Sequence, residues 1–230
     1  MGEKEKGFNP TFENGGYWEY YKDLERQFEG FLEYVPYLEG NEKTYSFRLA
    51  NILLSIGSHV DSAFKEMSGY PDFLERESCK EILRRANDKE GIIISGVRAF
   101  DEIYGLSSKE VTFKCLPERM QITPFKRVKP EWWDCYNDVK HDISNNLSKA
   151  TLNAVRDALA GAFLLNVVHI PSALRLYNYG VLQTRMTYQG SVGIYGDIGT
   201  SISVIRNSIM KKEKITGDVE TSIFKYDYYQ

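Results

Sequence analysis

The chain has 230 residues, of which 42% are hydrophobic and 13% aromatic, so it can bury one substantial core, or one core with an appendage, rather than two full domains. Its 29 basic and 32 acidic residues leave a formal charge of -3, which excludes the strong positive field of a dedicated nucleic-acid binder and limits any such contact to a local patch. The three cysteines, Cys79, Cys115 and Cys135, are odd in number and form no CxxC pair, which argues against a disulfide framework or a cysteine zinc site and predicts a reducing cytoplasm.

The amino terminus and the longest apolar run argue against secretion and membrane insertion. The start, MGEKEKGFNP, is charged and lacks the apolar stretch of a signal peptide. The run from Ala158 to Val168 is shorter than the roughly 20 residues that cross a bilayer. We therefore expect a cytoplasmic protein without membrane contact.

Apolar residues recur at spacings of three and four in several segments, which predicts amphipathic helices. The first two are predicted over 17–38 and 49–67, packed antiparallel, and two more over 73–86 and 92–106. Alternating spans at 110–116 and 120–128 predict a small hairpin or irregular extended segments. A helix then starts after Pro130, is interrupted by SNN at 144–146, and is followed by a nearly all-apolar helix from Leu147 to His169 at the centre of the core.

The carboxy-terminal part differs in composition, being richer in glycine, β-branched and aromatic residues. Four glycines at 190, 193, 196 and 199 match neither collagen nor a phosphate loop and indicate turns. The predicted fold class is therefore mainly α, an antiparallel helical bundle over 1–170 with a small β-containing insertion. A β-containing appendage over 171–230 is predicted to pack on the same domain.

One dozen residues, EWWDCYNDVKHD at 131–142, carries the main candidate site. Wound as a helix, this segment sorts its side chains into two neighbouring stripes. The apolar stripe contains Trp132, Tyr136, Val139 and Ile143. The second stripe contains Trp133, Asn137, Lys140 and His141. The pattern predicts that the apolar stripe is buried and that Asn137 and His141, one turn apart, lie at the rim of the core.

The run WWDCYNDVKHD, followed by LSKATLNAVRDALAGAFLL, resembles the end of the HEPN superfamily of four-helix-bundle proteins, in the branch with Trp-Trp, Tyr-Asn and Val-Lys-His in this order. The resemblance covers about residues 17–169. It implies a metal-independent endoribonuclease or RNA-binding protein of a defence or toxin system, commonly dimeric. Asn137 matches the polar position of the signature and His141 its histidine, but Tyr136 stands where the family has arginine.

The resemblance implies a set of site roles that needs no cofactor. His141 would act as base or acid, Asn137 would orient the phosphate or the imidazole, and Lys140 would stabilise phosphoryl charge in place of the missing arginine. Trp133 or Tyr136 would stack on a base. The implied partners are RNA, a second copy of the chain, and a cognate antitoxin or other protein, with no membrane. The nearby Lys126, Arg127 and Lys129 would contact the nucleic-acid backbone.

Structural alternatives remain for each of these residues. Asn137 and His141 can satisfy each other, or backbone groups freed at the helix break, while both tryptophans fill the core. In that case the protein is a catalytically inactive interaction or dimerisation module. The basic run can equally be a solvated loop.

The second predicted helix offers Arg48, His59 and Asp61 as contributors to the same rim, or as ordinary surface residues. Arg48 is a candidate to replace the missing arginine in space. The three histidines are far apart in sequence and give no metal-ligand spacing, so no metal site is predicted.

Overall fold

The computed structural model of the chain describes residues 16–67, 92–115, 119–168, 182–185, 187–188, 191–192 and 216–227. Its α-helices are α2 (Gly16–Leu32), α3 (Phe47–Met67), α6 (Ile92–Tyr104), α7 (Glu131–His141), α8 (Ile143–Asn146) and α9 (Leu152–Val168), with 3-10 turns η1 (Leu106–Ser108) and η2 (Leu147–Lys149). Its strands are β1 (Val111–Phe113), β2 (Met120–Ile122), β3 (Leu182–Arg185), β4 (Thr187–Tyr188), β5 (Ser191–Val192), β6 (Thr216–Glu220) and β7 (Phe224–Asp227). The mainly helical fold class with a small antiparallel sheet is confirmed. The helix predicted over 73–86 and the glycines at 190–199 lie outside the described residues.

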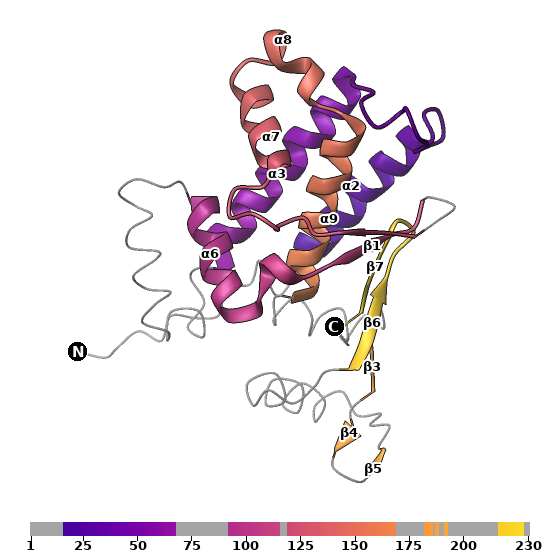
Figure 1. Cartoon of the computed structure of the whole chain (residues 1–230), viewed down its shortest axis with the longest axis vertical. Helices are drawn as coiled ribbons and strands as arrows, with labels where there is room; N and C mark the ends of the chain where they lie inside the picture. Colours follow the sequence, from indigo (N-terminus) through magenta and orange to yellow (C-terminus); the bar gives the residue numbers. More distant parts are fainter. Residues whose placement is uncertain are drawn as a thin grey trace, which may run out of the picture.

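The helices form a bundle in which α3 and α9 lie side by side, and α2 and α7 each pack on both (Figure 1). Helix α9 is almost wholly buried because its residues are apolar on all sides, as predicted for the centre of the core. Tyr17 and Tyr20, at the start of α2, contact His59 in the second half of α3. Gly30, near the end of α2, lies beside Arg48 at the start of α3. The first two helices are therefore antiparallel, as expected.

Two predicted helix ends were wrong, and local chemistry explains both. Helix α2 ends at Leu32 rather than near residue 38, and Pro36 lacks the N–H that a continuing helix needs. Helix α9 starts at Leu152 rather than Leu147. The Thr151 hydroxyl accepts a hydrogen bond from the Ala154 N–H at 3.1 Å and so caps the new helix.

The predicted insertion and the predicted carboxy-terminal segment share one antiparallel sheet, in the order β2-β1-β7-β6-β3. The hairpin β1–β2 pairs Val111 with Ile122, which confirms the hairpin alternative. Strand β1 then pairs with β7, placing Phe113 opposite Phe224. Since the Phe224 ring also stacks on Phe163 of α9 at 5.7 Å, the sheet shares the core of the bundle.

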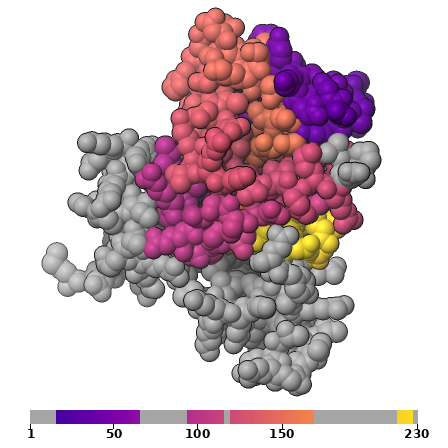
Figure 2. All heavy atoms as spheres, in the orientation of Figure 1, coloured from indigo at the N-terminus to yellow at the C-terminus, as the bar shows by residue number. Residues whose placement is uncertain are grey.

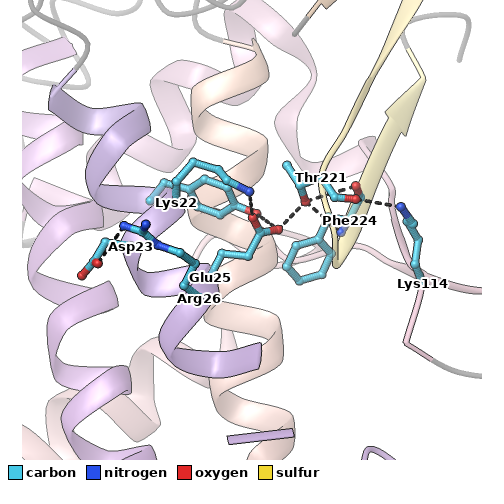
Figure 3. Close-up of polar contacts among 8 residues, drawn as sticks. Lys22, Asp23, Glu25, Arg26, Lys114, Thr221 and Phe224 are labelled. Carbon is cyan, nitrogen blue, oxygen red and sulfur yellow. Dashed lines mark hydrogen bonds and ion pairs between the residues drawn. The ribbon is translucent and has the colours of Figure 1, made fainter. Parts of the chain in front are cut away.

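A buried carboxylate ties α2 to the turn between β6 and β7 (Figure 3). Glu25 is fully buried and accepts hydrogen bonds from the Tyr21 hydroxyl at 3.0 Å, the Lys22 ammonium and the Thr221 hydroxyl. The Lys114 ammonium donates to the Thr221 carbonyl at 2.7 Å from the other side of the turn. Burial, and then the Glu25 charge, raise the pKa of Tyr21 well above its usual value. The cluster holds the β6–β7 turn against the first helix.

Candidate functional site

Helix α7 positions the candidate site, and its sequence matches its polarity. Pro130 precedes its first turn with φ -65°, acidic residues occupy that turn, and Lys140 and His141 occupy the last. The helix ends at His141, before the predicted break at 144–146, because the backbone of the next residue, Asp142, leaves the helical conformation with φ -155°. The Asp142 carboxylate accepts from the Asn145 N–H at 3.1 Å, so residues 143–146 form the short α8 instead of a break.

The apolar stripe is buried as predicted at Trp132, Tyr136 and Val139, whereas Ile143, the first residue of α8, is only partly buried. The Trp132 indole N–H donates to the Pro124 carbonyl at 3.0 Å, and the ring lies under Gly161 of α9. Tyr136 packs directly on Gly57 of α3, where a Cβ would approach its ring to 2.3 Å. The missing side chain at Gly57 is what allows α7 to lie close to α3.

Trp133 also lies inside the bundle, with its ring centroid 4.6 Å from that of Tyr136. Trp133 is 7% exposed and Tyr136 3%. Rings so enclosed have no free face for a base, so the structure does not place the two predicted stacking residues where RNA reaches them.

The three polar residues of the second stripe, here called the polar stripe, are accessible to solvent. Lys140 and His141 are exposed and Asn137 is half-buried. The Lys140 ammonium lies 5.2 Å from the centroid of the Tyr136 ring, a cation–π contact that holds it beside the helix. Within the described part of the chain, the side chains of Asn137 and His141 make no hydrogen bond or ion pair.

The Asn146 side chain lies at the junction of α7 and α8, where it donates to two carbonyls that already accept backbone N–H groups. The Asn146 amide donates to the Asp138 carbonyl at 3.1 Å and to the Asp142 carbonyl at 3.0 Å. The structural alternative required Asn137 and His141 to satisfy each other or backbone groups freed at the helix break, and neither side chain makes such a bond within the described residues. The fold therefore does not use the imidazole and the carboxamide in the way that alternative required.

The basic run lies at the opposite end of α7 from His141. Eleven residues of helix separate these ends by about 15 Å. Lys126, Arg127 and Lys129 are all exposed, but Arg127 pairs with Glu131 at 3.2 Å and Lys129 pairs with Asp134. The structure does not bring this run to the polar stripe.

The three candidates on α3 make their contacts with α2 or within α3. The Arg48 guanidinium reaches 3.3 Å from where a Cβ would stand at Gly30 of α2, so it faces that helix. His59 is buried, with its ring centroid 5.2 Å from those of Tyr17 and Tyr20, and burial lowers its pKa to about 4. Asp61 pairs with Lys65 one turn further along α3. None of these polar or ring contacts involves α7.

A second polar cluster surrounds an arginine that sequence reasoning missed. Arg156 of α9 is 9% exposed, and its Nε donates to Asp157 at 2.7 Å. Its other end donates to the Tyr37 hydroxyl, which in turn donates to Asn153. Burial raises the pKa of Tyr37 to about 12, and burial also raises the pKa of Asp157 although Arg156 opposes it. The sequence feature that could have identified this cluster is the adjacent pair Arg156 and Asp157 within an otherwise apolar helix. Charged side chains in a buried helix need hydrogen-bonding partners nearby.

This arginine cluster is a structural tie. The guanidinium is stacked over Tyr37, 5.2 Å from that ring's centroid, and its donors serve Asp157 and Tyr37. The network joins α9 to residues 33–46, the connection between α2 and α3. A cation held this way is not free to contact a phosphate.

Two further properties bear on ligands. The described residues contain no group of three or more histidine, cysteine or acidic side chains placed to hold a metal ion. None of the described helices combines the length and apolar character needed to span a bilayer.

Comparison of the chain with protein-family models, with curated proteins and with solved structures finds no match.

Proposed function

We propose that the protein binds RNA and cleaves it without a metal ion, at a site formed by Asn137, Lys140 and His141 of α7. The observation that carries the proposal is that His141 is exposed and Asn137 half-buried, and that neither side chain makes a hydrogen bond or ion pair within the described structure. The resemblance of about residues 17–169 to HEPN proteins of defence and toxin systems supports the same chemistry.

In the proposed reaction the His141 imidazole removes the proton of a ribose 2'-hydroxyl. The 2'-oxygen attacks the adjacent phosphorus, the bond to the 5'-oxygen breaks, and that oxygen takes a proton from solvent. The Lys140 ammonium stabilises the charge that builds on the phosphoryl oxygens. The Asn137 amide, one turn earlier on the same face, donates to a phosphate oxygen and orients the substrate.

A second candidate function is a catalytically silent interaction module. The observation that favours it is the burial of Tyr136, which occupies the arginine position of the family signature. A ring packed on Gly57 supplies neither positive charge nor a bidentate donor to a phosphate. In this case α7 contributes packing and a surface for a partner protein or a second copy of the chain.

One assay separates the two candidates. The purified chain is incubated with labelled RNAs of mixed sequence in EDTA, alongside His141→Ala, Lys140→Ala and the control Lys65→Ala, which removes an exposed lysine near the end of α3. We expect EDTA-resistant cleavage that falls about 100-fold or more without the imidazole, as for loss of a general base. We expect a smaller loss at Lys140 and little change in the control.

The module predicts a different pattern. No cleavage of any RNA by the parent, with the melting temperature and oligomeric state unchanged in both α7 variants, would discard the enzyme proposal. Cleavage that survives in His141→Ala at the parent rate would also discard it, because the activity would then arise elsewhere or from a contaminant.

A further inference from the structure

Exposed rings concentrate on one short stretch of the chain. Among the described residues, the large apolar side chains at least 36% exposed are Tyr20, Tyr34, Leu38, Tyr45, Phe47, Met120 and Val128. Four of them fall within residues 34–47, and that stretch holds the most exposed rings, Tyr34 at 79% and Phe47 at 65%. Single exposed apolar residues are ordinary on protein surfaces, but a local concentration of aromatic rings indicates a binding surface.

This stretch lies at the same end of the bundle as the proposed site. Residues 33–46 project at the upper right of Figures 1 and 2, at the end that carries α8, which directly follows α7. Tyr45 forms a β-bridge with Thr151, ten residues after His141. The Leu152 N–H donates to the Thr44 carbonyl at 2.8 Å and the Asn153 N–H to the Glu42 carbonyl at 3.1 Å. The two segments therefore form one continuous end surface.

The rings are displayed on a fixed backbone. Besides the bonds to α9, the Asn41 amide donates to the Pro36 carbonyl at 2.9 Å, and Gly40 adopts φ 93°, which favours glycine. Tyr37 anchors the middle of the stretch through Asn153 and Arg156. A surface ordered before binding loses less conformational entropy when a ligand arrives.

The charged residues beside the exposed rings favour a nucleic acid over a protein partner, and they favour Tyr45 and Phe47 as the rings that it contacts. Exposed Lys43 and Arg48 flank Tyr45 and Phe47, whereas exposed Glu33 and Glu39 flank Tyr34 and Leu38. Charged side chains thus border the exposed apolar side chains, whereas the centre of a protein–protein interface is depleted of charge. Rings beside cations are what unpaired nucleotides require, with bases on the rings and phosphates on the cations.

We propose that Tyr45 and Phe47 stack on unpaired bases of single-stranded RNA, with Lys43 and Arg48 contacting its phosphates, and lead the strand to His141. Tyr34, next to Glu33, contributes less. This inference rests on the proposed function, because it supplies the base-stacking role that the buried Trp133 and Tyr136 leave vacant.

The test is binding of a fluorescein-labelled 12-nucleotide single strand and the matching duplex, measured by anisotropy in a His141→Ala background that prevents cleavage. Tyr45→Leu and Phe47→Leu keep apolar area but remove the ring, and Tyr20→Leu removes an exposed ring near the other end of α2. We expect single-strand affinity to fall roughly 5- to 30-fold in each of the first two, consistent with loss of one base stack, and to stay within about twofold in the control. The duplex should bind much more weakly than the single strand.

The outcomes distinguish this inference from the proposed function. If the parent cleaves RNA through His141 but both ring variants bind like the parent, the stacking surface is wrong and the function stands. If the ring variants change the particle mass in light scattering while RNA affinity is unchanged, the surface is a protein interface and the inference is overturned. If the unsubstituted chain neither binds nor cleaves RNA, both fail together.

Discussion

The close contact between Gly57 of α3 and the Tyr136 ring of α7 predicts that a side chain at position 57 destabilises the protein. In Gly57→Ala the new Cβ would lie 2.3 Å from Tyr136 Cδ2 and 2.5 Å from Cγ and Cε2, far inside van der Waals contact. The ring is almost fully buried against Trp133 and cannot swing into solvent without opening the interface. Either the ring or the whole of α7 must therefore move by about an ångström.

Two effects of opposite sign decide the magnitude. Replacing glycine by alanine inside a helix stabilises by about 1 kcal/mol. Overpacking a filled core costs about 1–3 kcal/mol. Because the clash involves ring carbons of a buried side chain that has no space to move into, we expect the cost to exceed the gain, with a net loss of up to about 2 kcal/mol in the free energy of unfolding.

Tyr136→Ala supplies the matched test. That change alone should cost about 3–5 kcal/mol through the cavity it leaves, as for other large buried rings. With the ring gone, Gly57→Ala should become stabilising by up to about 1 kcal/mol, so its effect reverses sign. Tyr136→Leu should not reverse it, because leucine keeps the Cγ atom that stands 2.5 Å from the new Cβ.

Urea unfolding followed by tryptophan fluorescence measures these changes, with Gly30→Ala as control. A Cβ at Gly30 meets only the end of the flexible Arg48 side chain at 3.3 Å, so this variant should gain a few tenths of a kcal/mol or more from helix propensity alone. If Gly57→Ala is as stable as Gly30→Ala, or if removing the ring leaves its effect unchanged, the packing argument is wrong.

Two further predictions concern buried polar groups. His59 has a folded pKa of about 4, below the ordinary 6.5 of the unfolded chain, so stability should be lost as pH falls from about 6.5 towards 4, by at most about 3 kcal/mol. His59→Gln should lack this part of the slope in urea titrations across that range, and equal slopes would contradict the assignment. Thr221→Val removes a donor to the buried Glu25 carboxylate and should cost about 1.5–3 kcal/mol in the free energy of unfolding, whereas Thr221→Ser, which keeps the hydroxyl, should cost less. A valine variant as stable as the parent would show that the hydroxyl contributes nothing.

Local patterns in the sequence predicted the features that depend only on near neighbours. Periodicity located α3 to within two residues of its start and at its end, Met67. The two stripes of α7 follow from helical geometry alone, so Tyr136 is buried and His141 exposed as expected. The end of α2 was missed because apolar spacing continued past Leu32 while Pro36 lay ahead.

Features that depend on distant partners were not readable. An alternating span indicates a strand but not its neighbour, so nothing in 110–122 pointed to pairing with 224–227. Whether Trp133 stood at the rim or inside depended on how near α3 lies, which Gly57 decides. The directions of Arg48 and His59 depended on the rotation of α3 about its axis, which faces them towards α2.

The shared sheet has a consequence for the order in which the molecule assembles. Lys114 and Glu220 meet across 106 positions of sequence, and Glu25 meets Thr221 across 196. During synthesis the helices can associate first, but Phe113 and Phe163 each keep an uncovered face until the β6–β7 hairpin emerges from the ribosome. Until then the Glu25 carboxylate also lacks the Thr221 hydroxyl. A ribosome stalled before residue 216 would thus hold a nascent bundle that exposes aromatic side chains beside an incompletely hydrogen-bonded carboxylate. Chaperones recognise exposed apolar surface of this kind.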